Sequence, residues 1–208
     1  MRSAIRLIFI LLLPIRLVAQ IDFVVDSPEG HQLPFRILRD SCSVELTHPE
    51  TEWPYFKSEN QPIGTLTLPA TITHRGRNYH VVSIGSNALY GCRNLTALHC
   101  PSVVRIGSQA LNGCTALETI ELGDHLQSIA EGAFAYCRSL RDLRLPASLE
   151  HIGISAFACC EGLRQVAMTP ETFARCNALT FHLSPLMNDP KNRKTTPSGL
   201  LFWSLDDQ

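Results

Sequence analysis

Residues 152–168 read Ile-Gly-Ile-Ser-Ala-Phe-Ala-Cys-Cys-Glu-Gly-Leu-Arg-Gln-Val-Ala-Met, and the same pattern occurs three times upstream. Each copy has an Ala-Leu or Ala-Phe pair, then a cysteine, then apolar residues spaced as Leu-x-x-Leu-x-Leu. The equivalent cysteines are separated by 22, 23 and 23 residues: Cys92, Cys114, Cys137 and Cys160. Such a period is typical of a leucine-rich-repeat solenoid. The sequence therefore predicts an α/β solenoid of about four to five coils, with parallel strands and mostly β structure.

Each predicted coil has a long strand, a short strand and one helical turn. Alternating apolar residues place the long strands at 95–100, 117–122, 140–145 and 163–168. Short strands are expected at 103–106, 126–129 and 149–152, and single helical turns at 108–113, 131–136 and 155–159. The solenoid is predicted to occupy residues 65–183. Its last repeat is shortened, because Cys176 follows Cys160 by only 16 residues.

The recurring cysteines predict a structural ladder inside the solenoid, made of Cys92, Cys114, Cys137, Cys160 and Cys176. Coils rise by about 4.7–4.9 Å, which lies within the Cα separation that a disulfide accepts. Distance alone therefore leaves both bridged and free cysteines open. Parallel side-chain directions favour free buried thiols that donate to backbone carbonyls.

The two ends of the chain differ from the repeats. Arg2 and Arg6, a run of apolar residues and a small residue at Ala19 predict a signal peptide over residues 1–19, rather than a buried N-terminal helix. Residues 20–64 read as short strands separated by turns, which predicts an N-terminal β cap on the solenoid. Without residues 1–19 the chain has 15 basic and 19 acidic residues, a net charge of −4. This composition favours neither nucleic acid nor a membrane span.

Residues 184–208 are predicted to be a polar linker followed by an apolar C-terminal tail. One interpretation is that the tail caps the open end of the solenoid, since terminal repeats need a polar or covering element. The other is that it is exposed and docks a partner. The residues concerned are Leu200, Leu201, Phe202, Trp203 and Leu205.

The phrase Ile-Gly-x-x-Ala-Phe-x-x-Cys-x-x-Leu-x-x-Leu-x-Leu-Pro resembles the BspA-like leucine-rich-repeat family of secreted or surface bacterial proteins. The upstream segments 64–69 and 76–85 resemble that family's entry into its first repeat. Gly123 departs from the pattern, because Pro101 and Pro146 occupy its position in the neighbouring repeats. The resemblance implies an exported protein that binds other proteins, with adhesion to host matrix or plasma proteins. It implies no catalytic residues.

The sequence contains no clustered nucleophile, acid–base pair, phosphate loop or metal-ligand spacing, so we expect neither an enzyme nor a cofactor. The candidate binding face consists of outward strand residues in two columns. They are Ala97, Thr119, Asp142 and Gln165, and His99, Glu121, Arg144 and Ala167. This face is either solvated, with a weak Glu121–Arg144 ion pair, or a docking surface for a protein ligand.

Two functions follow from these patterns. The first is a secreted or cell-surface module that binds a protein ligand. The alternative is a structural component of an envelope or secreted assembly, joined through the apolar C-terminal tail.

Overall fold

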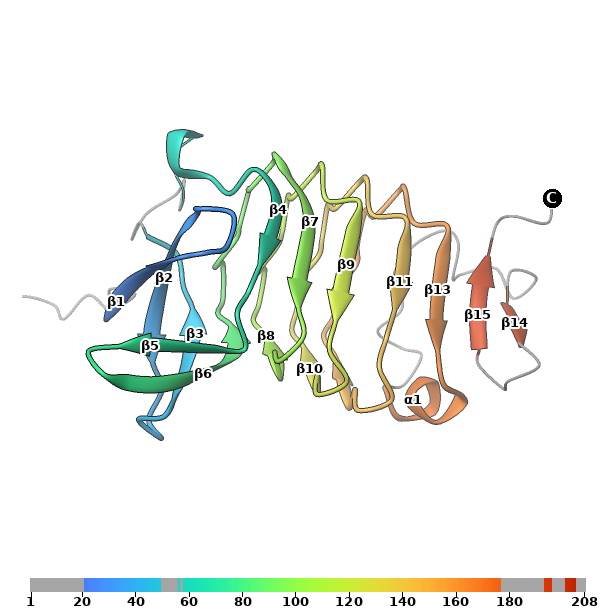
Figure 1. Ribbon diagram of the computed structural model, residues 1–208. Coiled ribbons are helices and arrows are strands. Elements are labelled where there is room, and N and C mark those ends of the chain that lie inside the picture. The colour runs from blue at the N-terminus through green and yellow to red at the C-terminus, as the bar shows by residue number, and fades with distance from the viewer. Residues whose placement is uncertain (1–20, 50–55, 57, 177–192, 196–200, 205–208) are drawn as a thin grey trace, which may run out of the picture.

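The repeating coils form two faces in the computed structural model: an 8-stranded sheet on the back, and a 3-stranded and a 4-stranded sheet in one row on the front, which we call the front sheet (Figure 1). The structure describes residues 21–49, 56 and 58–176, and the backbone of 193–195 and 201–204. The predicted signal peptide and residues 184–192 lie outside the described residues. Within the described part, one short α-helix occurs, α1 (Pro170–Arg175), and one 3-10 turn, η1 (Ser58–Asn60).

The front sheet is built from the long strands of successive coils. These are β4 (Gly64–Thr67), β7 (Leu95–Cys100), β9 (Thr119–Leu122), β11 (Asp142–Arg144) and β13 (Gln165–Met168). Strand β4 pairs with β7 and β7 with β9, all in parallel, and β11 pairs in parallel with β13. Strands β7, β9, β11 and β13 lie where the Leu-x-x-Leu-x-Leu spacing predicts them, within two residues at each end.

The back sheet begins with the N-terminal strands. Strands β1 (Phe23–Asp26), β2 (Gln32–Ile37) and β3 (Ser43–Leu46) form an antiparallel meander, and β3 then pairs in parallel with β6 (Arg77–Ile84). The short strands β8 (Arg105–Ile106), β10 (Ser128–Ile129) and β12 (His151–Ile152) continue the sheet in parallel. The predicted N-terminal segment thus extends the back sheet of the repeats through β3.

A hairpin precedes the first full repeat. Strand β5 (Thr71–His74) pairs antiparallel with β6, and only Arg75 and Gly76 lie between them. Both residues have positive φ, 49° and 74°, as a type I′ hairpin turn requires. Gly76 adopts this conformation without steric cost.

The core lies between the two sheets and is lined by the repeated apolar residues. Each Ala-Leu or Ala-Phe pair is fully or almost fully buried, and the rings of Phe134 and Phe157 stack with centroids 5.1 Å apart. These side chains come from equivalent positions of adjacent coils, so the same contact repeats along the axis. Such burial contributes about 1.5–3 kcal/mol for each large side chain.

The turns that carry these pairs correct one prediction. The helical turns expected at 108–113, 131–136 and 155–159 are not helices in the structure. Each coil has two residues in the left-handed region, at equivalent positions on either side of the apolar pair. They are Asn87 and Gly91, Gln109 and Gly113, Gly132 and Tyr136, and Ser155 and Cys159.

Left-handed residues end a right-handed helix because their φ is incompatible with it. The backbone instead forms successive tight turns that stack on the next coil. The amides of Leu89, Leu111 and Phe134 each donate to a carbonyl one coil further on, at 2.7 Å. The turn edge of the solenoid, residues 84–92, 106–114, 129–137 and 152–160, is therefore held together by hydrogen bonds between coils.

The end of the array is formed by α1 and two further strands. The Thr169 side chain caps the amide of Thr172, and Pro170 opens the helix with its preset φ. Strand β15 (Leu201–Ser204) pairs antiparallel with β13, and β14 (Arg193–Thr195) pairs with β15. The backbone of 201–204 thus adds a strand to the last described coil. Leu200 and Leu205 lie outside the described residues.

Candidate functional site

The cysteine ladder lies along the turn edge. Cys92, Cys114, Cys137 and Cys160 are at most 1% exposed, and Cys176 is 6% exposed. The thiols of Cys114, Cys137 and Cys160 donate to backbone carbonyls of the preceding coil at 3.2–3.3 Å. The eight cysteines, all within the described residues, form no disulfide, and Cys42 and Cys159 are the exposed ones.

Burial also makes the ladder chemically inert. It raises the pKa of Cys92 and of Cys160 from 9.0 to about 12, and it raises the pKa of Cys114 and Cys137 as well. The reactive form of cysteine is the thiolate, which these environments suppress. The ladder is therefore packing material for the coil, and the candidate site must lie elsewhere.

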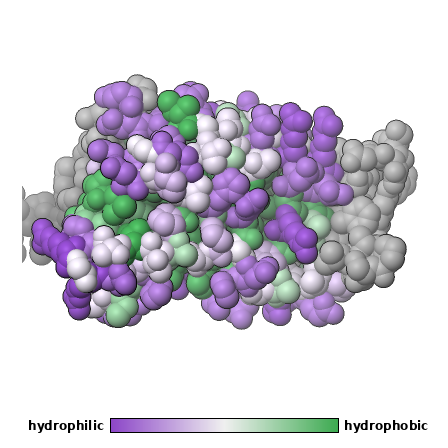
Figure 2. Space-filling model, viewed as in Figure 1, coloured by the Kyte–Doolittle hydropathy of each residue, from purple (hydrophilic) through white to green (hydrophobic). Residues whose placement is uncertain are grey.

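The front sheet carries the predicted binding face. The register places Ala97 beside Thr119 and His99 beside Glu121, and likewise Asp142 beside Gln165. Arg144 lies beside Ala167 in the same ladder. Each predicted column therefore crosses from β7 to β9, and again from β11 to β13. Figure 2 shows hydrophobic surface recessed between the polar side chains of this face.

The front sheet is interrupted between β9 and β11. All residues of both strands are described, and no strand pairing joins them. The backbone contact at their entrance is the Arg141 amide, which donates to the carbonyl of Glu118 at 3.3 Å. On the back sheet and the turn edge the same two coils remain hydrogen bonded. The two coils therefore separate on the front sheet alone.

Gly123 directly follows β9, next to this opening, and packs against the preceding coil. A Cβ at this position would overlap the carbonyl oxygen of Pro101 in the preceding coil. Because glycine has no side chain, the coil that holds β9 approaches the coil that holds β7 more closely than any other residue would allow. Proline, present at the equivalent positions 101 and 146, would not fit here.

The opening exposes residues that are buried in every other coil. Ile120 and Leu122 are half-buried, whereas their equivalents Leu143 and Leu145 are at most 3% exposed. A cleft of about 300 Å³ lies at this point. We name it the β9–β11 cleft, and its lining residues are Pro101, Ile120, Glu121, Leu122, Asp124, Arg144 and Pro146.

Charged groups flank the cleft, and their pairing corrects a second prediction. One of the two interpretations of this face includes a weak ion pair between Glu121 and Arg144, but Glu121 Oε2 lies 2.7 Å from His99 Nδ1 instead. In the described part of the chain, Arg144 and Asp124 make no ion pair or side-chain hydrogen bond. The face therefore presents an unpaired cation and an unpaired anion beside apolar surface.

Sequence reasoning found Glu121 and Arg144 but missed the rest of the cleft. Ile120 and Leu122 were assigned inward positions by the repeat, and Pro101, Asp124 and Pro146 were not considered for binding. The available signal was Gly123 in place of proline. This departure from the repeat lies between Leu122 and Asp124, two of the residues that line the cleft.

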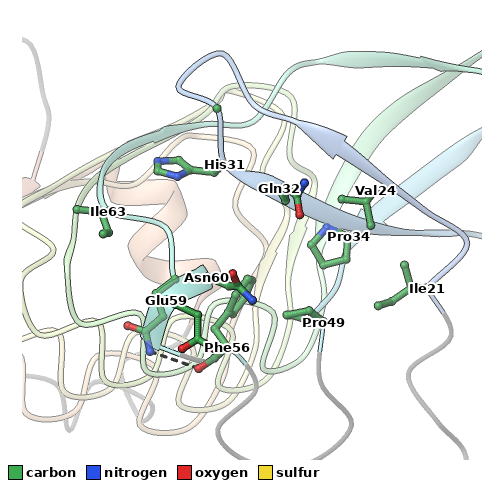
Figure 3. A pocket seen from close by; sticks show the side chains of 12 residues that line it. Ile21, Val24, His31, Gln32, Pro34, Pro49, Phe56, Glu59, Asn60 and Ile63 are labelled. Atoms are coloured by element: carbon green, nitrogen blue, oxygen red, sulfur yellow. Dashed lines mark hydrogen bonds between the residues drawn. The ribbon is translucent and has the colours of Figure 1, made fainter.

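Two other hollows occur among the described residues. One, of about 330 Å³, lies at the N-terminal strands, with Val24 and Pro34 on one side and Glu59 and Asn60 on another (Figure 3). Its lining residues include Pro49 and Phe56, and residues 50–55 lie outside the described part, so we build no site there. The other lies by the back sheet near His80 and Asp124. Across the described residues, no group of His, Cys, Asp and Glu side chains is arranged to hold a metal ion.

The repeats identify the family. Residues 71–186 match the model of the BspA type leucine-rich repeat region, with six copies. The chain belongs to the BspA-type leucine-rich repeat family. Six copies exceed the four to five coils that the cysteine spacing predicts. The match begins at residue 71, in the β5–β6 hairpin, and ends at residue 186, beyond Cys176. A search among curated proteins gave no match.

Solved structures of bacterial leucine-rich repeat proteins are similar to this chain. A leucine-rich repeat protein from Bacteroides ovatus is 29% identical, with a TM-score of 0.55, over 70% of this chain and 37% of its own. One from Bacteroides capillosus is also 29% identical, with a TM-score of 0.53, over 64% of this chain and 91% of its own. The matched part thus spans little more than a third of the B. ovatus protein.

Proposed function

We propose that this chain is a secreted or cell-surface binding protein that docks a protein ligand on its front sheet. The observation that carries the proposal is the β9–β11 cleft, where apolar side chains that are buried in other coils reach the surface beside unpaired charges. Protein interfaces combine such an apolar centre with a polar rim. Solenoids offer extended faces of this kind for binding.

Export and the ligand class rest on the sequence. The N-terminal pattern of residues 1–19 supports secretion or surface display, and membership in the BspA-type family supports protein binding. Among the described residues, no helix is long and apolar enough to cross a membrane. Host matrix and plasma proteins are the ligands that we propose to test first. The proposed role is binding, without catalysis.

The alternative function, an assembly joined through the apolar tail, has less support. The backbone of 201–204 is already paired with β13, so this part of the tail is engaged within the chain. The outermost strand, β14, contains Arg193 and Lys194. Charged residues on an edge strand disfavour the addition of further strands. We therefore propose that the tail covers the end of the solenoid.

The test is direct binding of the immobilised full chain to a panel of purified host matrix and plasma proteins. A double variant, Glu121→Lys with Arg144→Glu, reverses two charges at the cleft. The matched control, Arg105→Glu with Glu150→Lys, reverses two exposed charges away from the front sheet. We expect the front variant to weaken binding at least tenfold and the control to leave it unchanged. Binding to no member of the panel, or equal loss in both variants, would contradict the proposal.

A further inference from the structure

The β9–β11 cleft is the size of a side-chain site. Its volume, about 300 Å³, is at the lower end of the range for pockets that hold small molecules and cofactors. Its floor is apolar, from Ile120 and Leu122 of β9 and the buried ring of Pro146. A cleft of this size and lining accommodates one large apolar side chain with parts of its neighbours.

The rim of the cleft is charged on both sides, with opposite signs. Asp124 follows β9 and Arg144 belongs to β11, and both are exposed. Glu121 adds a second carboxylate on the β9 side, 76% exposed and bonded to His99. The β9 side is therefore acidic and the β11 side basic. A ligand that fills the cleft meets a carboxylate on one side and a guanidinium on the other.

From this arrangement we propose that the cleft binds an extended segment of a partner protein through one large apolar side chain flanked by a basic and an acidic residue. The apolar side chain lies on Ile120, Leu122 and Pro146. The basic residue lies on the Asp124 side, and the acidic residue pairs with Arg144, whose planar guanidinium suits a carboxylate. This inference rests on the proposed function, since it names the kind of segment that the front sheet recognises.

A peptide titration tests the inference with the full chain labelled with ¹⁵N. The first probe is acetyl-Asp-Gly-Leu-Gly-Lys-amide, in which alternation puts the charged side chains on the same side as the leucine. The second probe exchanges its Asp and Lys, and the third replaces the Leu of the first by Ala. Blocked ends remove terminal charges. We expect shifts at the amides of 120–122 and 144, a preference for one order of charges, and about tenfold weaker binding of the alanine probe.

Two variants give the test its control. Arg144→Glu should weaken binding of the tighter-binding leucine probe at least fivefold. The charged groups of the exposed rim are then all acidic. Arg164→Glu changes an exposed arginine of the same face outside the cleft, and it should leave binding unchanged. Both positions are on the surface, so neither variant is expected to affect folding.

Several results would overturn the inference. These are no shift at 120–122 with either leucine probe at millimolar concentration, equal binding of the leucine and alanine probes, or equal effects of Arg144→Glu and Arg164→Glu. Saturable shifts produced equally well by free leucine would reassign the cleft to a small molecule. Concentration-dependent shifts without peptide would reassign it to a second copy of the chain. If the peptides fail while the panel binding remains, the proposed function stands and this inference alone is lost.

Discussion

The turn edge and the front sheet are built by the same coils, yet only the turn edge is continuous along the described array. At the turn edge the Leu111 amide bonds to the carbonyl of Ala133 at 2.7 Å. On the front sheet the same two coils contribute β9 and β11, which share no pairing. A solenoid held in register on its other sides can therefore open one face at a single junction. The repeat supplies the scaffold, and a departure from the repeat supplies the site.

The largest expected effect concerns the sealed turn edge. Burial holds the pKa of Cys92 near 12 instead of 9.0, so the folded state keeps a proton that the unfolded state loses above pH 9. The stabilisation of the folded state by the buried, protonated thiol is complete below pH 9. It declines as the pH rises towards 12. The buried thiols of Cys92 and Cys160 should each lower the free energy of unfolding by about 1.4 kcal/mol at pH 10, and the other buried thiols of the ladder should change it in the same direction. Urea unfolding at pH 7, 9 and 10 measures the loss.

The Cys92→Ala variant provides the control for this prediction. It should show a smaller loss between pH 7 and pH 10 than the parent chain, by about 1.4 kcal/mol. The same slope in both chains would mean that Cys92 is not protected by burial, and the turn edge would not be sealed.

Next in size is the contrast between two leucines at one repeat position. Leu145 is 2% exposed, and its equivalent Leu122 is half-buried at the cleft. Leu145→Ala should lower the free energy of unfolding by about 2–5 kcal/mol. Leu122→Ala should cost clearly less, since part of its surface already meets water. Denaturant unfolding of both variants gives the comparison, and equal losses would mean that the front sheet is closed in solution.

A smaller effect is expected from Gly123→Ala. The added methyl group meets the backbone of Pro101, so the coils must shift, at a cost of about 1–3 kcal/mol. Gly91→Ala is the matched control: it has open space but a φ of 71°, a conformation that Tyr136 and Cys159 adopt at equivalent positions. Unfolding by urea should rank Gly123→Ala as the more damaging. The reverse order would mean that the close approach of Gly123 to Pro101 does not constrain the packing of these two coils.

The smallest effect is expected from the polar pair of the face. Glu121 lies 2.7 Å from His99, but its side chain is 76% exposed. Surface ion pairs contribute about 0–1 kcal/mol. Glu121→Gln should therefore change the free energy of unfolding by less than about 1 kcal/mol, measured by thermal or urea unfolding at pH 6. A loss above 2 kcal/mol would show that this face is a structural network.

Sequence predicted the parts of the fold that depend on periodicity. The range 95–100 matches β7, and the buried Leu89 and Phe134 lie where the repeat assigns them. The prediction of helical turns was wrong because residues such as Gln109 and Ser155 adopt positive φ. Neither residue type favours that conformation, so the sequence does not predict it. The cleft was missed because the pattern within one coil does not show whether the strands of adjacent coils pair, and β9 and β11 do not.

The central claim is that the β9–β11 cleft is open in solution and is covered by a bound protein. Hydrogen–deuterium exchange of the full chain, alone and with a binding member of the matrix and plasma panel, tests it most directly. We expect exchange to slow on binding at residues 119–124 and 142–146, while the turn edge stays protected in both states. Slower exchange confined to other segments, with these two unchanged, would contradict the account.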